Sequence, residues 1–364
     1  MGNKTQYWSI EPILKLKADY NIVFGERSNG KTYGINQHML LCWLKDHNNK
    51  CVYIRRYDDE LTPSKIRTLF DPFDIEKMSK GIYNRIQYRS RTFIIGKYDW
   101  DNGEWETQPE IFCYVASLNT WENSKGADRG FIKNIFFDEF ITRRPYLMNE
   151  YIAFQNCISS FIRDRGDCTI FLGGNSVSFY CPYFEEFSIP NIKNMQQGDL
   201  VCYSYENGLK IAVEYCSSVG ETKKSAKFFN FNDKAKMITT GMWEIPEYPH
   251  YPHSINFKKD VRLRFYILFE EEQLCCCVVK RDKDLFLYVH KYPKDIPENA
   301  IIFSKEFSGS PLKCRTFAEG MLECHNVIRN ILRSRKIYFA NNTVGEIFTH
   351  FHQWQSQISG FSIN

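Results

Sequence analysis

The residues with the clearest chemical meaning form a glycine-rich loop near the start of the chain: Gly25, Glu26, Arg27, Ser28, Asn29, Gly30, Lys31 and Thr32. They follow the apolar run 20–24 and match the pattern G-x-x-x-x-G-K-[ST] at every position. A strand, a glycine loop and a helix N-terminus in this order direct backbone N–H groups at phosphate oxygens. We expect Lys31 to reach the outer phosphates and the Thr32 hydroxyl to ligate Mg²⁺. The loop therefore predicts nucleotide binding; the alternative is a fortuitous glycine turn.

An acid pair, Asp138 and Glu139, follows the apolar run 133–137. In ATPases with such a loop, one carboxylate at the end of a buried strand holds the Mg²⁺ shell, and the next orients and deprotonates the attacking water. We assign these roles to Asp138 and Glu139 respectively. The pair alone would indicate a solvated acidic turn, but the glycine loop upstream favours the catalytic interpretation. A small-molecule kinase has little use for a glutamate beside the metal-binding aspartate.

Length and charge set broad limits on the protein. A chain of 364 residues is long enough for two domains with a sizeable core. The net charge of +4 gives no sign of a strongly basic coat. Residues 1–217 carry 26 Lys and Arg against 27 Asp and Glu, whereas residues 218–364 carry 21 against 16. A polyanionic partner is therefore expected at the second half.

The 13 cysteines do not indicate a disulfide scaffold. Cys275, Cys276 and Cys277 are consecutive in a β-like stretch, where neighbouring side chains point to opposite faces. No C-x-x-C pair occurs, so the spacing of a zinc ribbon is absent. We expect reduced thiols in a soluble, intracellular protein that lacks a signal peptide and a membrane-spanning segment.

The first half of the chain alternates strand-like and helix-like segments, which predicts a mainly parallel α/β sheet with helices on both faces. Helices are expected at residues 33–43, 61–70 and 146–163, and buried strands at 51–54, 133–137 and 168–172. Residues 85–118 contain β-like runs around a hairpin signal at Asp101, Asn102 and Gly103. We take residues 1–217 as one domain.

The second half is divided differently. Residues 218–250 are interpreted as a basic linker or lid, whose lysines are either solvated or in contact with a phosphate backbone: Lys223, Lys224, Lys227, Lys234 and Lys236. Residues 251–364 are taken as a small α+β domain. We expect three antiparallel strands at 262–269, 274–280 and 285–292, then a helix at 316–335, a strand at 337–339 and a helix at 343–354. This order is that of an RNase H-like fold.

Together these motifs resemble the DNA-packaging (encapsidation) ATPases of small tailed phages, the φ29 type, which are related to the large terminase subunits. The resemblance rests on the glycine loop, on Tyr-Ile-Arg-Arg-Tyr at 53–57, on Phe-Asp-Glu-Phe at 137–140 and on Asn-Ser-Val-Ser at 175–178. It covers residues 20–185 by motif and residues 245–364 by element order. It implies a P-loop ATPase domain of the ASCE class followed by an RNase H-like domain.

The same resemblance implies partners and a location. A homo-oligomeric ring, usually a pentamer, sits on the portal or connector of the prohead and drives double-stranded DNA into it with ATP and Mg²⁺. A structural packaging RNA is a further implied partner, and the setting is the host cytoplasm, without a membrane. Two alternatives stay open: a helicase-like ASCE ATPase, and a nucleotide-switched DNA or portal adaptor without motor activity.

The resemblance also implies roles for three more residues. Arg27 matches a loop arginine that responds to the γ-phosphate. Arg163 matches an arginine that acts in trans on the neighbouring subunit's nucleotide, where a guanidinium stabilises charge on the transferring phosphoryl group. Its alternatives are a surface cation at a helix end and the competing candidate Arg165. Asn175 matches a polar group that senses the γ-phosphate, or is simply an Asn in a left-handed turn after two glycines.

The second domain departs from the larger relatives, whose nuclease needs acidic residues that jointly hold two metal ions. The strand predicted at 262–267 has no acid, Asn341 and Asn342 follow the strand taken as the fourth, and the last helix offers only Glu346. We therefore expect no DNA cleavage. Binding of DNA backbone, portal or scaffold RNA is expected instead from the positive side chains Lys258, Lys259, Arg262, Arg264, Arg329, Arg333, Arg335 and Lys336.

Overall fold

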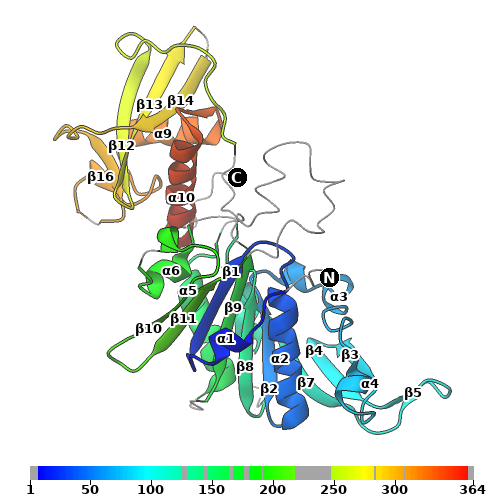
Figure 1. The fold of residues 1–364 in the computed structure, drawn as a ribbon. Helices are drawn as coiled ribbons and strands as arrows, with labels where there is room; N and C mark the ends of the chain where they lie inside the picture. Colours follow the sequence, from blue (N-terminus) through cyan, green and yellow to red (C-terminus); the bar gives the residue numbers. More distant parts are fainter. Residues whose placement is uncertain are drawn as a thin grey trace, which may run out of the picture. The chain divides into compact units, whose positions relative to one another are not determined.

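The computed structural model describes residues 7–124, 129–142, 144, 146–163, 167–175, 180–190, 192–217, 247–282, 284–306 and 308–359. The chain forms two compact units (Figure 1). The first comprises residues 1–143 and 150–244, and the second comprises residues 144–149 and 245–364. Among the described residues, no helix combines the length and the apolar character needed to cross a bilayer.

The described part of the first unit is built on a nine-stranded, mainly parallel sheet with the order β10-β11-β1-β9-β8-β2-β7-β4-β3. Its strands are β1 (Tyr20–Gly25), β2 (Lys50–Arg55), β3 (Arg85–Arg89), β4 (Thr92–Gly96), β7 (Glu110–Ser117), β8 (Ile132–Asp138), β9 (Thr169–Asn175), β10 (Leu200–Ser204) and β11 (Lys210–Tyr215). Strand β9 pairs in parallel with both β1 and β8. The strand of the glycine loop and the strand of the acid pair are therefore separated by one additional strand, which is the arrangement of the ASCE ATPases.

Helices α2 (Lys31–Lys45) and α5 (Glu150–Ile162) cover opposite faces of this sheet. Phe136 of β8 belongs to the same buried cluster as the apolar side chains of α2. Phe137 points the other way, and its ring centroid lies 5.4 Å from that of Phe154 on α5. A central parallel strand is buried on both faces, which explains why β8 is a continuous apolar run in the sequence.

The smaller elements of the first unit are partly as predicted. They are α1 (Glu11–Leu14), η1 (Asp58–Leu61), α3 (Pro63–Ile66), α4 (Ile75–Met78), η2 (Leu118–Ser124), α6 (Pro182–Glu186), η3 (Ile192–Asn194) and the hairpin β5 (Tyr98–Asp99) with β6 (Glu104–Trp105). The hairpin around residues 101–103 is confirmed. The long helix predicted at residues 61–70 is wrong: Thr62, before Pro63, is extended, and the helix that starts at Pro63 ends at Ile66.

The second unit, in its described residues, contains a six-stranded sheet with the order β16-β15-β12-β13-β14-β17. Its strands are β12 (Val261–Phe269), β13 (Glu272–Arg281), β14 (Asp284–Lys291), β15 (Ile301–Ser304), β16 (Lys313–Cys314) and β17 (Ile337–Phe339). Strands β12, β13 and β14 are antiparallel as predicted, while β15 is parallel to β12 and β17 is parallel to β14. Helices α9 (Glu323–Arg333) and α10 (Asn342–Ser359) contact β14.

Several predictions for the second unit need correction. The strand beside β12 is β15, so the strand at 337–339 is not the fourth strand of the RNase H-like order but an edge strand next to β14. Side chains after the fourth strand are therefore Lys305 and Glu306 rather than Asn341 and Asn342. The helix predicted from residue 316 begins at Glu323, because Gly320 interrupts it and the backbone N–H of Leu322 is capped by His325. The last helix is longer than the predicted 343–354.

Residues 144–149 lie in the second unit, although they precede α5 of the first unit in the chain. The backbone N–H of Asn149 donates to the carbonyl oxygen of Gln357 at 2.9 Å. Helix α5 consequently begins at Glu150 rather than at the predicted residue 146. Residues 247–250 also belong to the second unit, since Phe339 donates its N–H to the Pro249 carbonyl. Residues 218–246, with the lysines of the predicted linker, lie outside the described residues.

Candidate active site

The glycine loop joins β1 to α2 at the carboxyl edge of the first sheet. Gly30 has a φ of +99°, a conformation that side chains rarely adopt, and it stands directly before the first residue of α2. Lys31 is buried, and its Nζ donates to the Glu26 carbonyl oxygen at 2.6 Å and to Oδ1 of Asn29 at 3.2 Å. The loop therefore curls around its own ammonium group. Phosphate oxygens entering the loop would replace these two acceptors.

The acid pair lies against this loop. The Thr32 hydroxyl donates to Oδ1 of Asp138 at 3.4 Å, although the two residues are 106 positions apart in the chain. Glu139 has a φ of +57°, which is uncommon for a residue with a side chain and occurs where the surroundings hold the backbone in place. Asp138 is buried, whereas the side chain of Glu139 is 52% exposed. The pair thus offers one carboxylate to a metal shell and one to solvent.

Arg55, at the end of β2, binds both carboxylates and is not among the site residues predicted from sequence. Its Nη1 donates to Oδ2 of Asp138 at 3.3 Å, and its Nη2 donates to Oε2 of Glu139 at 2.7 Å. The Nε of Arg55 lies 3.3 Å from Oε2 of Glu60, and the Tyr53 hydroxyl donates to Oδ2 of Asp138 at 2.8 Å. In the sequence, this role is indicated only by the position of Arg55 at the end of a buried strand, within the family motif at 53–57.

Burial determines the protonation behaviour of this group. It raises the pKa of Asp138, while Arg55 and the hydrogen bond from Tyr53 act in the opposite direction. It also raises the pKa of Tyr53 well above its usual value, so this hydroxyl stays a donor. For Arg55, burial alone would lower the pKa, but the neighbouring carboxylates raise it. Burial therefore disfavours the charged form of Asp138, and a bound cation would favour it.

A buried ion pair fixes the backbone behind the acid pair. The Nε of Arg56 lies 2.8 Å from Oε2 of Glu150, with side chains 2% and 0% exposed. Arg56 also donates to the carbonyl oxygens of Glu139 at 3.0 Å and Phe140 at 2.6 Å. The Tyr183 hydroxyl donates to the other oxygen of Glu150 at 3.0 Å. Because Arg56 holds the Glu139 carbonyl, this pair maintains the unusual backbone conformation of the glutamate.

Asn175 lies at the same edge of the sheet, and its sensing role stays a prediction. It ends β9 directly beside Gly25 in the pairing of β9 with β1. It also lines a cavity of ≈ 840 Å³ that extends along the loop to Trp8 and Ile10. The Trp8 backbone N–H donates to the carbonyl oxygen of Asn29 at 2.9 Å, which ties this apolar wall to the loop. The cavity thus has a polar end for phosphates and an aromatic end suited to a nucleoside, and no sequence motif pointed to the latter.

The arginines predicted for the site do not lie together at the nucleotide loop. Arg27 is exposed in the glycine loop. Arg163 follows α5 at the side of the sheet where β8 and β9 begin, and it lies near Arg129, whose pKa it lowers after the larger effect of burial. The structure therefore does not bring Arg163 to the nucleotide loop of its own chain, and its action in trans stays a prediction. The competitor Arg165 lies outside the described residues, as do residues 176–178.

The sheet order, the glycine loop before α2 and the acid pair beside it define a P-loop ATPase of the ASCE class. The family model of the podovirus DNA encapsidation protein (Gp16) matches residues 2–237, and the chain belongs to this family. No curated protein matches the chain.

Solved structures of packaging motors have a similar fold. The bacteriophage phi-29 viral genome packaging motor assembly is 18% identical with a TM-score of 0.52, covering 95% of this chain and 99% of that chain. The phi-28 gp11 DNA packaging motor is 18% identical with a TM-score of 0.51, covering 96% and 98%. The N-terminal domain of the bacteriophage phi29 DNA packaging ATPase is 22% identical with a TM-score of 0.45, covering 57% and 95%. The first two matches extend over both units of the chain.

Proposed function

We propose that this protein is an ATP-hydrolysing motor that moves double-stranded DNA through a portal into a preformed capsid. Membership of the DNA encapsidation family supports the process. The observation that carries the catalytic part is the hydrogen bond between Thr32 and Asp138, with Glu139 adjacent to it. It joins the helix of the glycine loop to the strand of the acid pair.

Each side chain then has a defined task. The Thr32 hydroxyl and Asp138 carboxylate oxygens suit Mg²⁺, a hard cation that is bound through one or two carboxylates plus phosphates. When bound, this ion would neutralise charge on the phosphate oxygens. Lys31 exchanges its loop acceptors for phosphate oxygens. Glu139 accepts a proton from the attacking water, and Arg55 fixes the direction of its carboxylate. To Arg27 and Asn175 we assign the response to the outermost phosphate.

The proposed partners follow from the family rather than from the geometry. They are double-stranded DNA, the portal and prohead, and further copies of this chain in a ring, with a pentamer and a structural packaging RNA as the finer expectations. The proposed location is the prohead in the host cytoplasm. The phi-29 match is itself a motor assembly for genome packaging, which supports this setting.

We also propose that the second unit does not cut DNA. Strand β12 contains no acidic residue between Val261 and Phe269. Among the described residues, no three carboxylates lie close enough together to share a metal ion. Three of the expected cationic side chains already make contacts within the unit. Arg329 donates to the carbonyl oxygens of Phe317 and Gly320, Arg264 donates to the carbonyl oxygen of Phe257, and Lys336 pairs with Asp284. The other positive side chains stay as candidates for DNA or portal contact.

A packaging assay with proheads, DNA and ATP tests the proposal. Replacing Glu139 by Gln should leave ATP binding intact, reduce turnover by about 10²–10⁴-fold and stop packaging. Glu104→Gln, in the exposed β5–β6 hairpin, is the matched control and should package normally. An adaptor without motor activity would still support packaging when Glu139 is replaced and ATP turnover is lost. A helicase-like enzyme would separate the strands of a forked duplex.

A further inference from the structure

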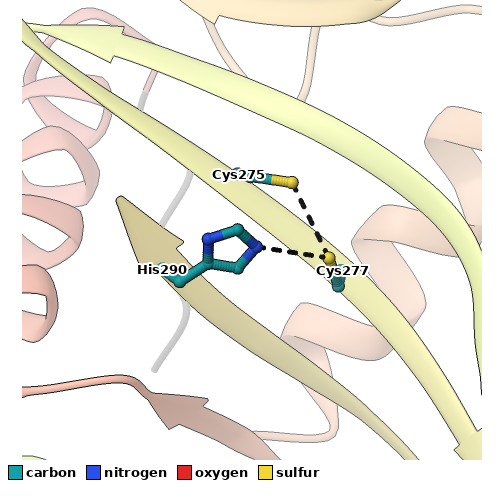
Figure 2. A group of neighbouring side chains, drawn as sticks. All are labelled: Cys275, Cys277 and His290. Atoms are coloured by element: carbon teal, nitrogen blue, oxygen red, sulfur yellow. Dashed lines mark hydrogen bonds between the residues drawn. The ribbon is translucent and has the colours of Figure 1, made fainter. Parts of the chain in front are cut away.

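The sheet of the second unit places three metal-binding side chains on one of its faces. Cys275 and Cys277 are two residues apart on β13, so they point to the same side, and His290 stands opposite Cys275 on β14. The Sγ atoms of the two cysteines are 3.7 Å apart, and Sγ of Cys277 lies 3.9 Å from Nε2 of His290. All three donor atoms lie within 4.8 Å of one another. Figure 2 shows the three side chains converging on a common point.

These separations fit a zinc ion. Zinc bonds of about 2.3 Å to sulfur and about 2.0–2.1 Å to nitrogen give sulfur–sulfur and sulfur–nitrogen separations of roughly 3.8 and 3.6 Å in a tetrahedral site. The two observed separations, 3.7 and 3.9 Å, are close to these values. Only the remaining pair, Cys275 with His290, needs a small side-chain rotation. Two thiolates and an imidazole are ligands that zinc prefers.

The imidazole of His290 is also oriented for a metal. Its Nδ1 lies 2.8 Å from the carbonyl oxygen of Lys291, which can only accept, so Nδ1 carries the hydrogen. The other nitrogen, Nε2, therefore directs its lone pair at Cys277. A backbone acceptor on the distal nitrogen is the arrangement that fixes metal-binding histidines in proteins. The ring of Phe257, 5.5 Å away between centroids, packs against the imidazole and limits its rotation.

The surroundings favour a charge-neutral site. Cys275 and Cys277 are 1% and 0% exposed and belong to an apolar cluster with Tyr266 and Val279. Two thiolates buried in such a cluster need compensating positive charge. The two positive charges of a zinc ion balance those of the two thiolates. Cys276 points to the opposite face and takes no part.

We propose that Cys275, Cys277 and His290 bind one Zn²⁺ ion, whose fourth position is open to water or another ligand. The ion joins neighbouring strands β13 and β14 in the middle of the second unit. The spacing C-x-C on a strand, with a histidine on the next strand, differs from the C-x-x-C pattern of zinc ribbons. This site is independent of the proposed ATPase chemistry, which uses residues of the first unit.

Metal analysis of the full-length protein, expressed with added zinc and purified without chelators, tests the proposal. We expect one zinc per chain in the wild type and in Cys276→Ala, which removes the thiol that lies between the ligands but faces away. The double variant Cys275→Ala/Cys277→Ala should retain less than a tenth of the metal. His290→Gln, which changes a half-buried side chain, should lower zinc affinity by at least tenfold. The circular dichroism spectrum and the thermal unfolding of each full-length variant serve as the control for folding.

Cobalt gives a second readout that depends on the ligands themselves. Co²⁺ added to the zinc-free protein should produce thiolate charge-transfer absorption and the intense visible bands of a tetrahedral ion. Both should be unchanged in Cys276→Ala and lost in the double variant. A wild type that holds no zinc and gives no cobalt–thiolate absorption overturns the proposal, even if the variants fail to fold. So does a mass lower by two hydrogens with Cys275 and Cys277 joined in a disulfide.

Discussion

Arg55 holds the two carboxylates of the acid pair at once, with Nη1 3.3 Å from Oδ2 of Asp138 and Nη2 2.7 Å from Oε2 of Glu139. A planar guanidinium with several fixed donors can do this, whereas a lysine ammonium cannot match both directions. Glu139, the proposed catalytic base, is therefore positioned by a residue on the neighbouring strand rather than by its own backbone alone.

We expect Arg55→Ala to lower the kcat for ATP about 10²-fold, because a misdirected Glu139 no longer meets the attacking water. The KM for ATP should change much less, since the phosphate-binding loop is intact. Arg55→Lys should restore only part of the rate. Arg89→Ala, an exposed arginine of β3, serves as the control in the same steady-state assay. A rise in KM as large as the fall in kcat would contradict a positioning role.

Lys31→Ala should abolish nucleotide binding. In the wild type, ATP with Mg²⁺ at 100 times its Kd should stabilise the fold by about 2.7 kcal/mol and raise the melting temperature. The variant should show no such rise, because the loop has lost the cation that faces the phosphates. Thr32→Ser keeps the hydroxyl that contacts Asp138 and should behave as the wild type. A normal ATP-dependent rise in Lys31→Ala would exclude the loop as the binding site.

Breaking the buried pair of Arg56 and Glu150 should destabilise the protein strongly. Replacing one partner, as in Glu150→Gln, leaves a buried charge without its counterion and is expected to cost about 3–5 kcal/mol. The exposed pair of Lys97 and Glu106, at 2.9 Å, is the matched comparison, and its loss should cost less than about 1 kcal/mol. Denaturant unfolding of both variants measures the difference. If both variants lost the same free energy of unfolding, burial would not determine how much an ion pair contributes.

The raised pKa of Asp138 gives a pH dependence with a definite sign. A buried acid whose pKa is raised destabilises the fold where it is ionised, above its folded pKa, and this penalty disappears as the pH falls below its ordinary value of about 3.9. Without Mg²⁺ and nucleotide, Asp138→Asn should therefore melt no lower than the wild type at pH 7. It should nevertheless lose the stabilisation by Mg²⁺ and ATP.

Thermal melts of both proteins between pH 4 and pH 8 provide the test. Wild-type binding of Mg²⁺ and ATP should weaken as the pH falls through the raised pKa of Asp138, that is, before an exposed aspartate would titrate. A melting temperature of Asp138→Asn clearly below the wild type at pH 7 would contradict this account of the carboxylate.

Much of this site could be predicted because each of its parts is a short motif in the sequence. The glycine loop, the acid pair and Asn175 each sit at the end of a strand that is recognisable from its apolar run, and parallel strands bring their carboxyl ends to one edge. Arg55 could not be assigned in this way, since an arginine after a buried strand usually faces solvent. Its role depends on β2 lying beside β8, which no local pattern specifies.

In the second unit too, the sequence predicted local features but not the pairing of distant strands. The antiparallel meander was predictable from alternation and tight turns, but β15, four residues long, follows a proline-containing stretch and gives too short a signal. The convergence of His290 with two cysteines depends on the register between β13 and β14. The spacing of cysteines along one strand could not show it.

The polypeptide leaves the first unit after residue 143 and returns to it at Glu150, so the two units share more than the single junction near residue 244. The stretch that departs begins five residues after Glu139 and is anchored to α10 through Asn149. A fragment that starts at residue 245 would therefore lack a piece of its own fold, and the complementary fragment would carry that piece without its supporting helix. The C-terminal fragment alone therefore does not contain the whole of its unit, and the piece that it lacks follows closely after Glu139 in the chain.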